Sequence, residues 1–201
     1  GNGIGEAIAR RLARDGARVL AVDMEESDTR DTDERIEFWR GDVSKAADVA
    51  AMMSEAERRF GRIDLVANNA GISGGSTPFH ETTEETWDKV IGVNLRGAFL
   101  VLRASIAALL RAGGAIVNTG SIGSFRATPG AGAYITSKGG LLMMTRQAAL
   151  EYARQDIRVN IVCPGTIDTR LLERAPKALR TAAKRGDGVE AHGCSVSQGR
   201  A

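Results

Sequence analysis

The sequence predicts a doubly wound α/β fold, in which a parallel β-sheet is covered by helices on both faces. Stretches with helical periodicity alternate along the chain with short apolar runs, as expected for strands buried in such a sheet. Two loops rich in glycine, serine and threonine, at residues 71–77 and 120–132, directly follow such runs. Because ligands bind beyond the carboxyl ends of the strands in this class, we expect both loops at the ligand-binding edge.

Each expected element rests on its own pattern of apolar residues. In the helices these residues recur at every third or fourth position, and the strands are short runs rich in β-branched residues. The expected helices cover residues 6–14, 46–60, 84–111 and 134–154. The expected strands cover residues 18–22, 36–39, 65–67, 115–118 and 157–163.

Composition limits the number of domains and the classes of partner. The 201 residues are 43% hydrophobic and 26% charged, which supplies apolar mass for one globular core. The net charge is +2 without long blocks of one sign, which disfavours nucleic acid and membrane surfaces as partners. The most apolar stretch, 97–117, is broken by Arg103 and Arg111, so it lacks the ~20 uninterrupted apolar residues of a membrane span.

Cysteine and histidine are too sparse for a metal or disulfide framework. Cys163 and Cys194 match no zinc-site spacing, which favours a reduced, cytoplasmic chain. His80 and His192 are the two histidines, too few for a histidine-based metal site. We therefore expect no metal.

The first candidate site is the glycine-rich turn at residues 1–5 (GNGIG), which opens the first helix. Glycines let the backbone approach a pyrophosphate, and the helix N-terminus stabilises its negative charge. Asp23 lies about 20 residues beyond Gly3 at the end of the next strand, where a carboxylate can bind ribose hydroxyls. The alternative is an ordinary glycine turn followed by a strand-end aspartate.

The second candidate site is Tyr134 and Lys138, one helical turn apart in the motif YITSK. A nearby ammonium favours the phenolate, so we expect Lys138 to lower the pKa of Tyr134 from about 10 toward the working pH. Tyr134 would then be a general acid and base. In isolation, such a pair is far more often an exposed tyrosine and lysine on a helix surface.

Two further polar residues stand near these elements. Ser121 follows an expected strand and can offer its hydroxyl to a carbonyl or alkoxide oxygen, although such serines also satisfy loop backbone. Asn94 lies among apolar neighbours in the expected helix over 84–111, where a buried amide needs a partner. The alternative for Asn94 is a packing residue hydrogen-bonded to backbone.

Together these residues resemble the classical short-chain dehydrogenase/reductase family. Residues 1–5 match the last five positions of its T-G-x-x-x-G-x-G turn, and residues 68–71 are its N-N-A-G signature. Residues 41–43 resemble its adenine-contacting segment, and residues 164–169 the segment beside the nicotinamide. The residues that match its catalytic tetrad, in order, are Asn94, Ser121, Tyr134 and Lys138.

The resemblance covers residues 1–172 and implies a Rossmann-type sheet. The family's first strand and its C-terminal strand are not recognisable, so we expect a partial Rossmann domain over 1–174 and an atypical tail over 175–201. We also expect that the chain is truncated at both ends, and that it is unstable or inactive on its own.

The resemblance implies NAD as the cofactor, because a carboxylate at Asp23 repels the 2′-phosphate of NADP. The implied cofactor-binding residues are Gly1, Asn2, Gly3, Ile4, Gly5, Asp23, Asp42, Val43, Asn69, Ala70, Gly71, Tyr134, Lys138, Pro164, Gly165, Ile167 and Thr169.

The implied activity is interconversion of a secondary alcohol and a ketone. Tyr134 would exchange a proton with the substrate oxygen, Lys138 would lower its pKa and hold the nicotinamide ribose, and Ser121 would position the oxygen. Asn94 would fix a helix kink and a water that links Lys138 to solvent. Two alternatives are a 3-oxoacyl-thioester reductase using NADPH and a non-catalytic dinucleotide-binding sensor.

The resemblance also implies where the substrate binds and how copies of the chain assemble. The substrate pocket would be built from residues 72–80 and 124–133, whose glycines fit a roomy or mobile site but identify no substrate. The helices expected over 84–111 and 134–154 resemble those through which family members form tetramers, so we expect a homotetramer.

Overall fold

The computed structural model describes residues 3–25 and 33–169. Its helices are α1 (Ile4–Arg14), α2 (Ala46–Phe60), α3 (Glu84–Ile91), α4 (Ala98–Leu109) and α5 (Gly132–Glu151). Its strands are β1 (Val19–Asp23), β2 (Ile36–Arg40), β3 (Leu65–Asn68), β4 (Gly114–Thr119) and β5 (Ile157–Val162). Gly1, Asn2 and the tail expected over 175–201 lie outside the described residues.

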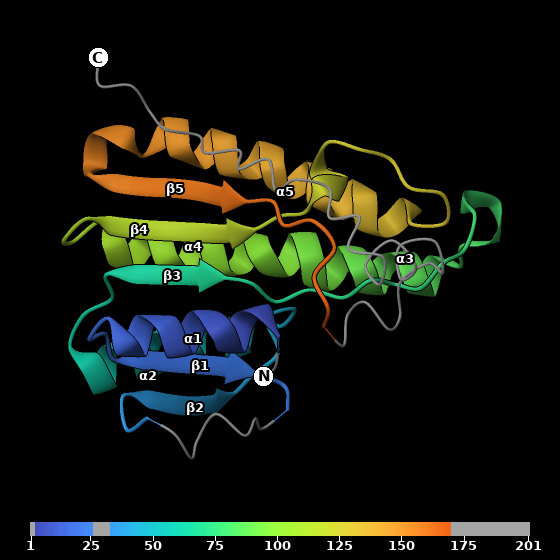
Figure 1. The fold of residues 1–201 in the computed structure, drawn as a ribbon. Helices are drawn as coiled ribbons and strands as arrows, with labels where there is room; N and C mark the ends of the chain where they lie inside the picture. The colour runs from blue at the N-terminus through green and yellow to red at the C-terminus, as the bar shows by residue number, and fades with distance from the viewer. Residues whose placement is uncertain (1–2, 26–32, 170–201) are drawn as a thin grey trace.

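All strand pairs among the described residues are parallel, and they form two separate sheets, the first of β1 and β2 and the second of β3, β4 and β5. β1 pairs with β2, with Val19 opposite Ile36. β4 lies between β3 and β5, with Ala115 opposite Leu65 and also opposite Arg158. Figure 1 shows α1 in front of the strands and α4 behind them. Parallel strands with helices on both faces confirm the doubly wound class.

The main core lies between the three-stranded sheet and the helices behind it. α4 and α5 present apolar side chains to β4 and β5, and Leu109, Ile116 and Ile157 are fully buried there. A smaller cluster joins α1 to the two-stranded sheet through Ala13 and Ile36. Figure 1 shows that all five strands point the same way, so the loops that follow their carboxyl ends lie along one edge.

The helix expected over 84–111 is not one regular helix. α3 and α4 are joined by a π-helical segment, Gly92–Gly97, in which Asn94 is buried. A π-bulge inserts one residue into a helix and is frequent at functional sites. The periodicity remains helical on both sides of the bulge, which is why the sequence pattern predicts one continuous helix.

The run Glu84–Leu109 is 26 residues long and reaches a mean hydropathy of 1.5 in an 18-residue window. By length and composition alone it could cross a membrane, yet half of that window is buried inside the structure. α4 packs against α2, β3 and β4, and α3 packs against α5. A helix with such neighbours is a core helix, because its apolar residues face protein.

Candidate active site

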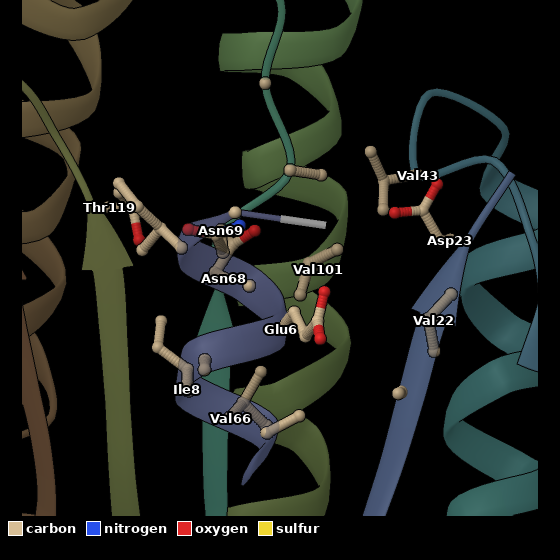
Figure 2. Close-up of a pocket in the computed structure, with 18 of the residues that line it drawn as sticks. Glu6, Ile8, Val22, Asp23, Val43, Val66, Asn68, Asn69, Val101 and Thr119 are labelled. Carbon is tan, nitrogen blue, oxygen red and sulfur yellow. The ribbon is translucent and has the colours of Figure 1, made fainter. Parts of the chain in front are cut away.

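A cavity of about 950 Å³ extends from the space between β1 and β3 to the loops beyond the strand ends. Figure 2 shows its two parts: Val22 and Val66 line the apolar part between the strands, and Asp23, Asn69 and Thr119 lie near the strand ends. The residues that line it and that the sequence predicts to bind a cofactor are Gly3, Ile4, Gly5, Asp23, Asp42, Val43, Asn69, Ala70, Gly71, Tyr134, Lys138, Pro164, Gly165, Ile167 and Thr169. Ser121 also lines it.

The glycine turn brings three separate segments of the chain together. Gly3 is the N-cap of α1 with a φ of 67°, a conformation that glycine adopts without strain. A Cβ atom on Gly3 would lie 3.0 Å from Cγ2 of Thr169, and one on Gly5 would lie 2.8 Å from Nδ2 of Asn69. The start of α1, the loop after β3 and the segment after β5 therefore meet at one point, where the helix N-terminus favours an anion.

Asp23 ends β1 at the rim of this cavity. Its carboxylate accepts a hydrogen bond from the backbone N–H of Glu25 at 3.2 Å. Figure 2 shows Asp23 beside Val43. The neighbouring Asp42 uses its carboxylate locally, since Oδ1 accepts the backbone N–H of Ser44 at 2.9 Å and the Ser44 hydroxyl at 2.7 Å. These bonds hold the pKa of Asp42 below its usual range.

Tyr134 and Lys138 stand on the first two turns of α5 and face the same cavity. Nζ of Lys138 lies 5.8 Å from the centroid of the Tyr134 ring and donates to the backbone carbonyl of Thr119 at 2.7 Å. Lys138 is only 4% exposed. Ser121 and Tyr134 are neighbours, since a Cβ on Gly123 would lie 3.3 Å from Oγ of Ser121 and 3.7 Å from Cε1 of Tyr134. Oγ of Ser121 accepts the Gly123 N–H at 3.0 Å. This pair is therefore not an exposed surface pair.

Burial moves the pKa of both side chains away from their usual values. It raises the pKa of Tyr134, and the hydrogen bond with Ser121 only partly offsets that rise. It lowers the pKa of Lys138 to about 8. The expectation that Lys138 brings the pKa of Tyr134 down is therefore wrong for this structure, because loss of water disfavours the phenolate more than neighbouring groups favour it.

Asn94 does not line the cavity, and its amide is engaged by protein groups. Oδ1 accepts the backbone N–H of Ile72 at 2.8 Å, and Nδ2 donates to the Ile72 carbonyl at 2.8 Å and to Oγ of Ser137 at 3.1 Å. The Ser137 hydroxyl donates to the carbonyl of Tyr134 at 2.7 Å. Asn94 thus joins the π-helical turn to the loop after β3 and to the start of α5.

Several residues near this site were not singled out from the sequence. Thr119 holds Lys138 through its carbonyl, and Ser124 donates its hydroxyl to the carbonyl of Lys138 at 2.9 Å. Asn118 and Thr145 form a buried hydrogen bond beneath them. A polar residue inside an apolar strand or helix is a signal for such partners, because a buried polar group needs one.

The two loops expected to form a substrate pocket are joined. Thr77 and Ala131 form an isolated parallel bridge, and the Thr77 N–H donates to the Gly130 carbonyl at 2.9 Å. Ser73 and Thr128, one from each loop, line the cavity. Beside them the Phe79 ring covers Gly132, where a Cβ would lie 2.7 Å from the ring, so this glycine serves close packing.

The arrangement combines two chemical capacities. A helix N-terminus with backbone N–H groups can hold a pyrophosphate, and Asp23 stands where a ribose can be bound. A phenol, a hydroxyl and an ammonium at the adjacent end of the cavity can exchange a proton with an oxygen atom. Within residues 3–25 and 33–169, no three side chains of His, Cys, Asp or Glu gather as metal ligands.

Comparisons with known proteins point to the same chemistry. A family model described as "Enoyl-(Acyl carrier protein) reductase" matches residues 1–190. The 3beta-hydroxysteroid dehydrogenase of Mediterraneibacter gnavus is 35% identical, over 90% of this chain and 68% of that protein. The 2-(R)-hydroxypropyl-CoM dehydrogenase of Xanthobacter autotrophicus is 41% identical, over 86% of this chain and 73% of that protein.

A solved structure also resembles this chain closely. It is the 3-ketoacyl-(acyl-carrier-protein) reductase from Brucella melitensis complexed with NADH, with a TM-score of 0.83 and 31% identity. The match covers 90% of this chain and 78% of the other.

Proposed function

Since the chain belongs to the classical short-chain dehydrogenase/reductase family, we propose that Tyr134 is the general acid and base of an NAD-dependent reaction. The protein is an oxidoreductase that interconverts secondary alcohols and ketones, with a nicotinamide dinucleotide as cofactor. The observation that carries the proposal is the placement of Tyr134 with Ser121 and Lys138 at one end of the cavity that also holds the glycine turn.

In this proposal, Tyr134 and Ser121 act on the substrate oxygen, and Lys138 acts on the Tyr134 phenol. Tyr134 passes its proton to a ketone oxygen in the reduction, or takes one from an alcohol in the oxidation. A bound nicotinamide would donate the hydride in the first case and accept it in the second. Ser121 lies beside Tyr134 on the same cavity, so its hydroxyl can orient the same oxygen. Lys138 holds the nicotinamide ribose and adds positive charge near the developing phenolate.

Asn94 positions this group in the proposed mechanism. Its bonds to Ile72 and Ser137 fix the π-helical turn against α5, which supports the expected role in a helix kink. The proposed role in a water relay from Lys138 would use the backbone of the turn, because the amide is already paired with protein atoms.

The catalytic proposal is tested with NAD and a panel of cyclic secondary alcohols. We expect NADH absorbance to rise with at least one of them. Absence of turnover with the whole panel, combined with tight NADH binding, would favour the alternative of a dinucleotide-binding sensor. Turnover restricted to 3-oxoacyl thioesters with NADPH would favour the alternative of a 3-oxoacyl-thioester reductase. The similarity to a 3-ketoacyl reductase structure is a reason to include these substrates.

Preference for NAD over NADP is proposed to depend on Asp23 at the end of β1. We expect NADH to bind about ten-fold more tightly than NADPH, because a charged hydrogen bond to the ribose contributes about 1.5–3 kcal/mol and a 2′-phosphate would meet the carboxylate instead. Asp23→Asn should remove most of this preference in fluorescence titrations. The matched control is Glu25→Gln, which changes an exposed carboxylate two residues away. Equal affinities in the unchanged protein would contradict the proposal.

We also propose a homotetramer and a cytoplasmic location. Large apolar side chains are exposed on α4 and α5, and a second copy could cover them. They are Phe99, Leu110 (the α4 C-cap), Met143 and Leu150. The expected partners are a small alcohol or ketone and further copies of the chain, without nucleic acid or membrane. The sparse cysteines of the chain, with no disulfide-rich or zinc-site spacing, favour a reducing compartment.

A further inference from the structure

A chain of buried polar side chains runs beneath the candidate active site and crosses four elements. Asn118 in β4 and Thr145 in α5 are fully buried, and Asn68 in β3 is 6% exposed. Nδ2 of Asn118 donates to Oγ1 of Thr145 at 2.9 Å, and Oδ1 of Asn118 accepts from Nδ2 of Asn68 at 3.0 Å. Asn68 also donates to the carbonyl of Ala98 in α4 at 3.1 Å.

Asn118 and Thr145 each lie close in sequence to a residue of the candidate active site. Asn118 directly precedes Thr119, whose carbonyl accepts the bond from Lys138. Thr145 lies two helical turns after Lys138 on the same helix, α5. A bond between Asn118 and Thr145 therefore ties the strand that holds the Lys138 ammonium to the helix that carries it.

The apolar contacts of α5 do not by themselves fix its position along the strand. Ala148, Ala149 and Leu141 are buried against the core, and such contacts are non-directional. A hydrogen bond is lost when donor and acceptor separate by more than about 0.5 Å beyond their normal distance. Thr145 accepts from Asn118 while its own hydroxyl donates to the Leu141 carbonyl at 2.7 Å, so its Oγ1 is held from both sides.

We propose that the hydrogen-bonded chain Asn68–Asn118–Thr145 sets the axial position of α5 against β4, which makes Asn118 and Thr145 positioning residues for Tyr134 and Lys138. The three side chains touch neither the cofactor nor the substrate in this proposal. They act through α5, by holding Tyr134 beside Ser121 and Lys138 at the carbonyl of Thr119. The inference rests on the proposed role of Tyr134.

A test that needs no substrate follows the phenolate of Tyr134 by its ultraviolet absorbance. The chain has two tyrosines, so Tyr152→Phe leaves Tyr134 as the sole reporter. In that background, Thr145→Val keeps the shape of the side chain and removes the hydroxyl, whereas Thr145→Ser keeps the hydroxyl and removes the methyl group. Ser105→Ala is the matched control, because Ser105 is fully buried and donates to the Val101 carbonyl within α4.

We expect Thr145→Val to raise the pKa of Tyr134 by about half a unit to one unit, because displacement of α5 would move the phenol away from Ser121, whose hydroxyl lowers that pKa. Thr145→Ser should leave that pKa unchanged although its melting temperature falls, and Ser105→Ala should do the same. If Thr145→Val lowers the melting temperature but leaves the pKa of Tyr134 unchanged, the proposal is overturned. If Tyr134→Phe leaves turnover intact, the proposed function fails instead, so the two failures are distinguishable.

Discussion

Replacing Tyr134 with phenylalanine is expected to lower kcat by about 10²–10⁴-fold, the usual contribution of a general acid or base. The substitution removes only the hydroxyl, so the ring still fills its place on the first turn of α5. Loss of the single Tyr134 hydroxyl should change the free energy of unfolding by no more than about 1–2 kcal/mol. The measurement is kcat and KM with NAD and the best alcohol of the panel.

The matched control for this experiment is Tyr152→Phe, which removes the second phenolic hydroxyl of the chain. Tyr152 follows α5 at its other end and packs on the main core, away from the cavity. Its substitution should leave kcat within about two-fold of the original. NADH affinity should be the same in both variants. A Tyr134→Phe protein that keeps full turnover would show that another group handles the proton.

The order of the elements followed from the sequence because it depends on local patterns. The strand bounds agree within about one residue, since short apolar runs between polar loops mark buried parallel strands. The apolar pattern did not reveal the π-helical turn at Gly92–Gly97, because one inserted residue leaves the periodicity intact on each side, whereas the family resemblance implied a helix kink at Asn94. The turn is stabilised by Ile72, a residue of a distant loop, and that contact has no local signal.

The groups of the candidate site followed from motifs, whereas their electrostatics did not. The spacing of Tyr134 and Lys138 places a charge near a phenol, and from that alone a lowered tyrosine pKa was expected. Burial acts in the opposite direction and raises the pKa of Tyr134, and burial depends on packing from several elements. The partners of Asn118 are likewise remote, since Thr145 and Asn68 lie 27 and 50 residues away in the sequence.

Lys138→Met is expected to abolish most activity and to change how stability depends on pH. Burial lowers the pKa of Lys138 from 10.5 to about 8, so between these values the unfolded chain holds more protons at this residue than the folded one. The stability of the unchanged protein should therefore rise with pH across this window, and the penalty of the buried charge is fully present below about pH 8. The pKa difference corresponds to about 3 kcal/mol at most.

In the Lys138→Met protein this rise should be absent, because methionine carries no proton. Near neutral pH the variant should be more stable by about 1–2 kcal/mol, because the buried charge is gone. The gain stays below the full value of about 3 kcal/mol because the Thr119 carbonyl loses its hydrogen-bond partner. Near pH 10 it should be less stable than the unchanged protein, since Lys138 is then largely neutral and still pairs with Thr119. Urea unfolding at the two pH values gives both differences.

The control for this effect is Lys89→Met on α3, where the lysine is exposed and its ammonium remains in water. Its difference from the unchanged protein should be the same at both pH values, within about 0.5 kcal/mol. Raising the pH above about 10 adds an opposing effect, because the raised pKa of Tyr134 makes the folded chain hold more protons there. A Lys138→Met protein that tracks the Lys89→Met protein at both pH values would mean that Lys138 is hydrated in solution, and its buried bond to Thr119 would then not hold the ammonium beside Tyr134.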